Sequence, residues 1–170
     1  RTALMSFHAR AESLHTSQHQ PGIKRRTGQP QRVHDIADPF GMGLLLGNAV
    51  RFGRAVDVMI AGEGLETILS LRQVMPSMPA AAALSANHLA ALELPAGLRR
   101  LYLARDDDPA GHRAVETLAD RARAAGVEAL TLVPALDDFN EDLRRLGAEV
   151  LRNGLCAQLA PDDRPRVRST

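Results

Sequence analysis

Two groups of acidic residues stand where apolar stretches of the sequence end. Glu63 lies between two glycines just after the apolar stretch 57–61, and three aspartates, Asp106 to Asp108, follow the apolar stretch 98–104. Mg²⁺ commonly takes one or two carboxylates as ligands, together with waters and substrate phosphates. Adjacent carboxylates repel one another unless a cation or hydrogen-bond donors compensate. Because Asp106 and Asp108 are two positions apart, they face the same side of an extended chain. The pattern predicts a divalent-metal site.

Both groups also have a structural interpretation. A carboxylate at Glu63 is favoured at the N-terminus of a following helix, and its two glycines suit a tight strand-to-helix turn. The local sequence around Glu63 slightly favours this interpretation. Asp108 is suited to the N-cap position before Pro109, in a solvated acidic turn.

A third acidic stretch, DDFNED, begins at Asp137. It offers Asp138, Asn140 and Glu141 as oxygen donors, but acidic residues are also typical of a first helical turn because they complement the helix dipole. For any single residue of this stretch we favour the helical-turn interpretation. Taken together, however, acidic residues at three strand ends favour metal-assisted phosphoryl chemistry, since such ends can converge on one crevice.

The elements that must position these residues follow from the apolar pattern. Strands are expected at 57–61, 80–84, 98–104 and 127–133, after two short strands at 44–46 and 49–52, and helices at 65–74, 86–92, 109–125, 138–146 and 149–159. Strands that alternate with helices in this way predict an α/β fold with a mainly parallel four-stranded sheet flanked by helices. Ser85 is expected to cap the second helix.

Four segments are expected along the chain. Residues 1–40 form an irregular or disordered segment that is basic and His-rich, residues 41–55 a short β lead-in, residues 56–159 the α/β domain, and residues 160–170 a frayed polar tail. Four histidines of the first segment (His8, His15, His19 and His34) lack accompanying acidic or cysteine ligands, so a metal site there is not expected.

Composition narrows the function. The chain has 170 residues and a net charge of +1, so nucleic-acid binding would depend on local patches or bound metal. A single cysteine, Cys156, excludes a disulfide framework and a CxxC zinc site and favours the cytoplasm. Abundant arginine and alanine indicate a bacterial source, the lack of 18 consecutive apolar residues argues against membrane association, and the lack of an initiator Met suggests a fragment.

The blocks GEGLETILSL, LSANHLAALELP, LYLARDDDPAGHRAVETLADRARAAGVEALTL and DDFNEDL resemble a Toprim domain. The resemblance covers about 41–159 and is greatest to the primase-like group of bacterial plasmids and integrated mobile elements. The Toprim signature is a glutamate after the first strand and DxD after the third, which here are Glu63 and Asp106 with Asp108. The resemblance implies a Toprim, Rossmann-like fold.

The resemblance also implies roles. Glu63 would be the general acid or base, and Asp106 and Asp108, together with Glu63, would hold Mg²⁺ or Mn²⁺. Asp138 matches a further acidic position of the family, less specifically. Asp107 stands where many relatives have Asn. The zinc-binding module that usually precedes such primases is not possible with one cysteine.

Phosphate contacts with DNA or RNA are expected from Arg51, Arg105 and Arg113, with few aromatic residues to stack on bases. The predicted function is Mg²⁺-dependent nucleic-acid phosphoryl or nucleotidyl transfer, primase-like, in the DNA replication of mobile elements, with a helicase or other replication proteins as partners. Two alternatives stay open: a non-catalytic DNA- or partner-binding Toprim module, and a Toprim-type nuclease.

Overall fold

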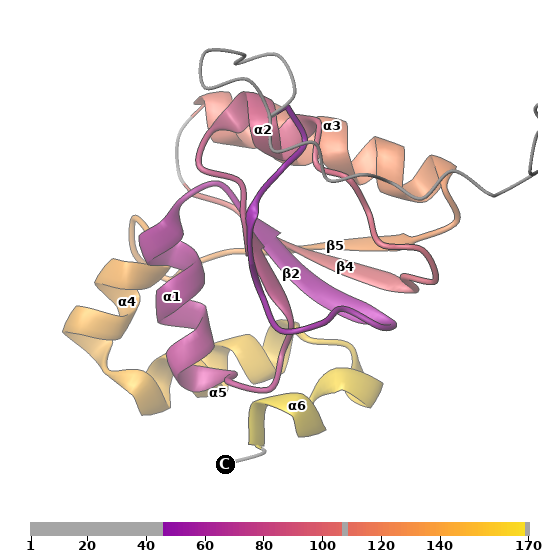
Figure 1. Ribbon diagram of the computed structural model, residues 1–170. Helices are drawn as coiled ribbons and strands as arrows, with labels where there is room; N and C mark the ends of the chain where they lie inside the picture. Colours follow the sequence, from indigo (N-terminus) through magenta and orange to yellow (C-terminus); the bar gives the residue numbers. More distant parts are fainter. Residues whose placement is uncertain (1–45, 107–108, 169–170) are drawn as a thin grey trace, which may run out of the picture. The chain divides into compact units, whose positions relative to one another are not determined.

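The computed structural model describes residues 46–106 and 109–168, all within the compact unit formed by residues 39–170 (Figure 1). Its strands are β1 Val50–Phe52, β2 Val58–Gly62, β3 Ala80–Ala82, β4 Arg100–Ala104 and β5 Glu128–Leu132. Its helices are α1 Leu65–Val74, α2 Ala86–Ala90, α3 Pro109–Ala124, α4 Phe139–Leu146, α5 Ala148–Gln158, the 3-10 helix η2 Pro161–Asp163 and α6 Pro165–Arg168. The irregular segment expected at 1–40 lies outside the described residues. So does the strand expected at 44–46, except for its last residue.

The five strands form one sheet in the order β1-β3-β2-β4-β5. Strands β2 to β5 run parallel to one another, as expected. β1 joins the sheet as a fifth strand, antiparallel to β3. In the register of the sheet, Gly62 lies opposite both Ala82 and Ala104, and Ala104 lies opposite Leu132. The carboxyl ends of the parallel strands are therefore level with one another.

The core lies on both faces of the sheet because every residue of β2 and β4 is buried. Side chains alternate between faces along a strand. Thus Val58 and Ile60 pack with residues of α1, α4 and α5, whereas Met59 and Ala61 pack with residues of α2 and α3. Figure 1 shows α1, α4 and α5 on one side of the sheet and α2 and α3 on the other. An apolar run of this kind is typical of a parallel strand covered by helices on both faces.

The helix limits have local causes that the sequence displays. Ser85 caps α2, and its hydroxyl oxygen accepts a hydrogen bond from the backbone N–H of His88 at 3.3 Å, as expected. Helix α1 ends shortly before Pro76, which cannot continue a helix without loss of a hydrogen bond. Helix α3 is followed by Gly126, whose φ of 76° lies in the left-handed region that glycine adopts readily.

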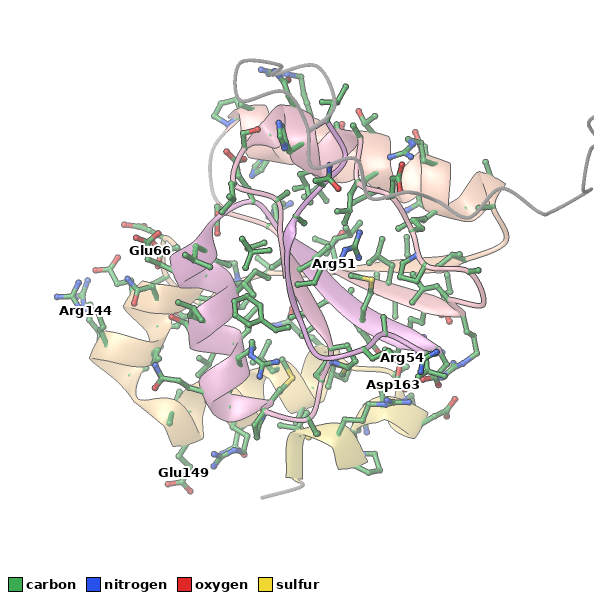
Figure 2. All side chains as sticks on the ribbon, viewed as in Figure 1. Arg51, Arg54, Glu66, Arg144, Glu149 and Asp163 are labelled. Atoms are coloured by element: carbon green, nitrogen blue, oxygen red, sulfur yellow. The ribbon has the colours of Figure 1, made fainter. Side chains whose placement is uncertain are left out.

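The segment after residue 160 differs from the expected frayed tail. It forms η2 and α6, and the side chain of Asp163, which is labelled in Figure 2, is buried. Its carboxylate accepts hydrogen bonds from Arg100 and from the Tyr102 hydroxyl, the latter at 2.8 Å. The Tyr102 oxygen in turn accepts the backbone N–H of Ala160 at 3.0 Å. Up to residue 168 the expectation of a frayed tail was wrong, because one buried acid ties this segment to β4.

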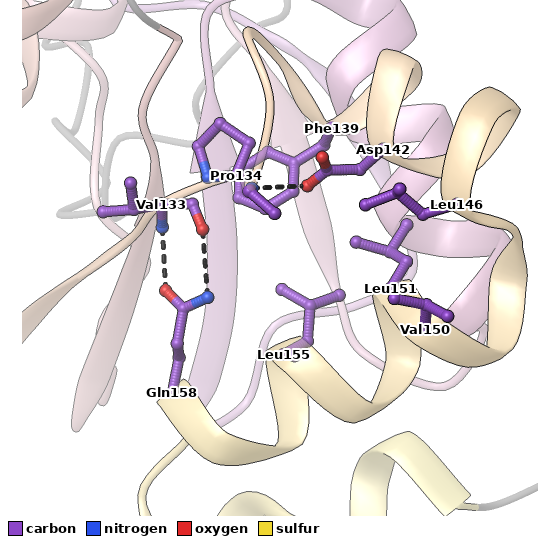
Figure 3. A pocket seen from close by; sticks show the side chains of 11 residues that line it. Val133, Pro134, Phe139, Asp142, Leu146, Val150, Leu151, Leu155 and Gln158 are labelled. Atoms are coloured by element: carbon purple, nitrogen blue, oxygen red, sulfur yellow. Dashed lines mark hydrogen bonds between the residues drawn. The ribbon is translucent and has the colours of Figure 1, made fainter.

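A second connection joins the end of α5 to the residue that follows β5. The side-chain amide of Gln158, the last residue of α5, donates to the Val133 carbonyl at 3.0 Å and accepts the Val133 N–H at 2.8 Å (Figure 3). The two residues line a cavity of about 280 Å³ between the end of β5, α4 and α5. The amide thereby makes the pair of hydrogen bonds that a neighbouring strand would make with Val133.

Candidate metal centre at the carboxyl edge of the sheet

Glu63 and Asp106 follow two adjacent parallel strands. Glu63 comes directly after Gly62, the last residue of β2, and Asp106 comes two positions after Ala104, the last residue of β4. Since Gly62 and Ala104 are paired in the sheet, both acidic residues belong to loops that leave it at the same level. This is the edge where open α/β sheets place their sites.

A hydrogen bond connects these two loops. The hydroxyl of Thr67, in the first turn of α1, donates to Oδ1 of Asp106 at 2.9 Å. Thr67 is only 5% exposed, so the bond lies in a part-buried environment where its direction is well defined. No local pattern selects Thr67, because its partner Asp106 lies in the loop after β4, 39 positions away.

Gly64 makes room beside the same carboxylate. A Cβ atom at this position would lie 3.5 Å from Asp106 Oδ2 and 3.3 Å from Thr67 Oγ1. The φ of Gly64 is −76°, which other residues adopt without strain, so its backbone conformation does not require glycine. The missing side chain instead leaves open a small space that is bordered by a carboxylate oxygen and a hydroxyl.

The backbone of Glu63 is held by the two residues that follow β3. The N–H of Leu84 donates to the Glu63 carbonyl at 2.8 Å, and the N–H of Ala83 donates to the Gly62 carbonyl at 2.9 Å. Leu84 has a φ of 69°, the single positive value of a non-glycine residue in the described part of the chain, and its side chain is 59% exposed. A residue in this region carries backbone strain, which often occurs at functional sites. Nothing in the sequence predicted it.

The third acidic stretch has mainly structural bonds. Asp138 is the N-cap of α4, and its Oδ1 accepts the backbone N–H of Glu141 at 2.6 Å. Asp142, 2% exposed, accepts the backbone N–H groups of Ala135 and Leu136, both at 2.8 Å, and so fixes the loop after β5. The helical-turn interpretation therefore describes these residues, and a metal-binding role for Asp138 stays a prediction.

The three arginines expected to contact phosphate differ in position. The guanidinium of Arg51 donates to the Glu93 carbonyl at 2.8 Å, from the middle of β1. Arg105 lies between β4 and Asp106 and is half-buried. Arg113 is exposed on α3, one turn after its start. Arg105 and Arg113 are thus the two nearest in sequence to the acidic edge.

The donor set at this edge suits a hard divalent cation. Glu63 and Asp106 supply oxygen ligands, which Mg²⁺ prefers, and the space at Gly64 adjoins one of the Asp106 oxygens. Within residues 46–106 and 109–168, three or more His, Cys, Asp or Glu side chains do not come together as a ready metal site. Asp107 and Asp108 lie outside the described residues. The carboxylates among the described residues fit a divalent metal in their chemistry.

The fold and this edge define a Rossmann-like α/β domain with acidic residues at the carboxyl ends of adjacent strands. The family profile described as Toprim domain matches residues 58–149, which is more than half of the chain. The chain therefore belongs to the Toprim family, whose domains are in general Mg²⁺-binding modules that process nucleic acids. Neither a curated protein nor a solved structure matches the chain. Of the helices in the described part, none has the length and apolarity to cross a membrane.

Proposed function

We propose that this chain is a primase-like Toprim domain that carries out Mg²⁺- or Mn²⁺-dependent nucleotidyl transfer in the DNA replication of bacterial plasmids and mobile elements. The observation that supports it most directly is the link between the two signature motifs. Asp106 is hydrogen-bonded to the helix that starts just after Glu63, at the carboxyl edge of a parallel sheet. Residues 56–159 would form the catalytic domain, and residues 41–55 its lead-in.

The residues have distinct proposed roles. Asp106 and Asp108, with Glu63, would hold the metal, and Asp138 would supply a further acidic group. When bound, the metal neutralises phosphate charge and orients the reacting groups. Glu63 acts as the general acid or base, because a carboxylate at this edge can take the proton of an attacking hydroxyl or protonate a leaving oxygen.

Nucleic acid would be bound mainly through its phosphates. Arg105 and Arg113 are the proposed contacts, and Arg51 a third that would have to leave the Glu93 carbonyl. The described aromatic side chains are poorly placed for base stacking. Tyr102 and Phe139 are buried in the core, and the guanidinium of Arg72 covers the ring of Phe52 at 5.0 Å. We therefore expect binding with little sequence preference and strong dependence on salt.

Two variants test this proposal in the full chain. Template-dependent primer synthesis is measured with Mg²⁺ and with Mn²⁺, and metal binding is measured by calorimetric titration of Mn²⁺. We expect Glu63→Gln to lower the synthesis rate by roughly 10²- to 10⁴-fold, the range of a lost general acid or base, while it retains binding of single-stranded DNA. Asp106→Asn should abolish Mn²⁺ binding and synthesis together.

The alternatives give different results in the same assays. Metal-dependent cleavage of DNA without synthesis would indicate a nuclease that uses the same residues. Binding of DNA by the wild-type chain without synthesis or cleavage would indicate a binding module. Equal Mn²⁺ binding by the wild type and Asp106→Asn would contradict the metal site itself.

A further inference from the structure

The Thr67 side chain makes an unusual hydrogen bond for a threonine in a helix. A hydroxyl in a helix commonly donates to the backbone carbonyl three or four positions earlier. Thr117 in α3 does this, with a bond of 2.8 Å to the Arg113 carbonyl. Thr67 instead donates to a carboxylate 39 positions away in the sequence. Its hydroxyl therefore joins α1 to the loop after β4 and makes no bond within its own helix.

We propose that Thr67 is a positioning residue that fixes the Asp106 carboxylate for the cation. This inference rests on the proposed metal-dependent function. The hydroxyl occupies Oδ1 at 2.9 Å, and Oδ2 is the oxygen nearest the space beside Gly64. With one oxygen held, the carboxylate cannot rotate freely about its terminal torsion, and Oδ2 stays beside Gly64.

The anchoring of α1 supports this role. Thr67 is buried in the first turn, and one turn later the Ser70 hydroxyl donates to Oδ1 of Asn140 in α4 at 3.4 Å. The buried side chains Ile68 and Leu71 fix the same helix in the core. The donor on Thr67 therefore belongs to a rigid element, which is what a group that orients a metal ligand requires.

Gly64 completes the arrangement. Its backbone conformation tolerates a side chain, but a Cβ atom would stand 3.5 Å from Asp106 Oδ2, on the side where the cation is proposed. Glycine adds no such atom beside Oδ2. Thr67 and Gly64 thus adjoin the two oxygens of one carboxylate: Thr67 holds Oδ1, and Gly64 places no side chain against Oδ2.

The test uses Mn²⁺ titration calorimetry on the full chain with Thr67→Val and Thr67→Ser. Valine retains the volume but lacks the hydroxyl, whereas serine retains the hydroxyl. Loss of a group that orients a metal ligand typically weakens affinity by 10- to 100-fold, so we expect a loss of about this size in Thr67→Val and near wild-type affinity in Thr67→Ser. Thr117→Val, which removes an exposed hydroxyl that donates to a carbonyl of its own helix, is the matched control and should bind as the wild type does.

Thermal unfolding without and with Mn²⁺ separates positioning from a loss of folding. Thr67→Val should remain folded but lose the upward shift of its unfolding midpoint that Mn²⁺ produces in the wild type. Equal affinities of Thr67→Val and the wild type would overturn the inference, and so would a loss in Thr67→Ser as large as in Thr67→Val.

Gly64→Ala gives a second measurement if the valine variant does not fold. It should fold and should lower Mn²⁺ affinity, and wild-type affinity in this variant would contradict the arrangement at Oδ2. Failure of the proposed function has a different signature, since the wild type itself would then bind no Mn²⁺ that Asp106→Asn removes.

Discussion

At the scale of single residues, backbone strain and hydrogen bonds identify two positions near the proposed ligands that could not be recognised from their residue types. Leu84 is a large apolar residue with a positive φ and an exposed side chain, and its N–H holds the carbonyl of Glu63. Thr67 is an ordinary helix threonine by sequence, yet its hydroxyl binds a signature aspartate. Both residues support the proposed ligands without belonging to the signature.

Replacement of Leu84 by glycine tests the backbone strain. Because glycine adopts positive φ without a steric penalty, and because the leucine side chain is largely exposed, Leu84→Gly should be more stable than Leu84→Ala by about 1 kcal/mol. Urea unfolding of the two variants measures the difference. Equal stabilities, or a more stable alanine variant, would show that position 84 carries no such strain.

At the scale of elements, a side-chain cap and bonds to the preceding loop decide where α4 begins. Asp138 caps α4 through the Glu141 N–H, and Asp142 holds the preceding loop from within the same helix. These bonds orient α4 against α1, with which it shares the Ser70 to Asn140 contact. The acidic character of this stretch thus has a structural cause, whether or not a metal also uses it.

Removal of the Asp138 cap distinguishes the two interpretations of this residue. Asp138→Ala should lower the free energy of unfolding by about 0.5–2 kcal/mol, the usual cost of a lost N-cap. Asp138→Asn and Asp138→Ser, which can still cap, should recover most of it. Parallel Mn²⁺ titrations decide the metal role: if all three variants bind as the wild type does, Asp138 is a cap alone.

Most elements could be predicted because their causes are local. The strands around 58–62 and 100–104 are apolar runs between turn residues, and the caps at Ser85 and Asp138 are visible beside them. The acidic signature could be read from order and spacing. Thr67 and Leu84 could not be found in this way, because their importance depends on partners in other elements and on a backbone angle that leucine rarely adopts.

At the scale of the whole molecule, the carboxyl ends and the starts of the strands carry different groups of charged residues. The carboxyl edge carries the acidic residues, whereas the start of the strands carries a network of ion pairs in which Asp163 joins Arg99, Arg100 and Arg166. The prediction of a frayed tail was wrong because these ion pairs are not visible in the sequence. The partners of Asp163 lie some sixty positions earlier in the sequence, and no local pattern indicates them.

Asp163→Ala should destabilise the chain by about 3–5 kcal/mol, because it leaves the buried Arg100 with Glu128 as its remaining partner. Asp162→Ala, which removes an exposed carboxylate from the neighbouring position, is the control and should change stability by less than about 0.5 kcal/mol. Chemical denaturation of both variants measures these effects. A similar small effect in the two variants would contradict the importance of the network.

Stability should also depend on pH through this network. Burial alone would raise the pKa of Asp163, but hydrogen bonds from Arg100 and Tyr102 outweigh it and lower that pKa. Its contribution is therefore present above about pH 4 and is lost as the pH falls through the lowered value. Burial raises the pKa of Tyr102 to about 12, so its contribution is present below about pH 10 and is lost as the pH rises toward 12.

The midpoint of urea unfolding, measured from pH 2 to 12, records both the acid and the alkaline loss of stability. Tyr102→Phe should remove the alkaline decline that is due to this group, and its lost hydrogen bonds should cost about 1–3 kcal/mol at neutral pH. An unchanged alkaline limb in this variant would contradict the assignment.

The amide of Gln158 has a consequence beyond the single molecule. β5 is the last strand of the sheet, and a strand in that position offers its outer backbone groups to a strand from another molecule. Just beyond β5, Gln158 already uses both groups of Val133. A second chain that approached this end in register would meet a completed pair of bonds. One side chain at the end of a helix therefore occupies the backbone groups of Val133 that a strand from another molecule would need at this end of the sheet.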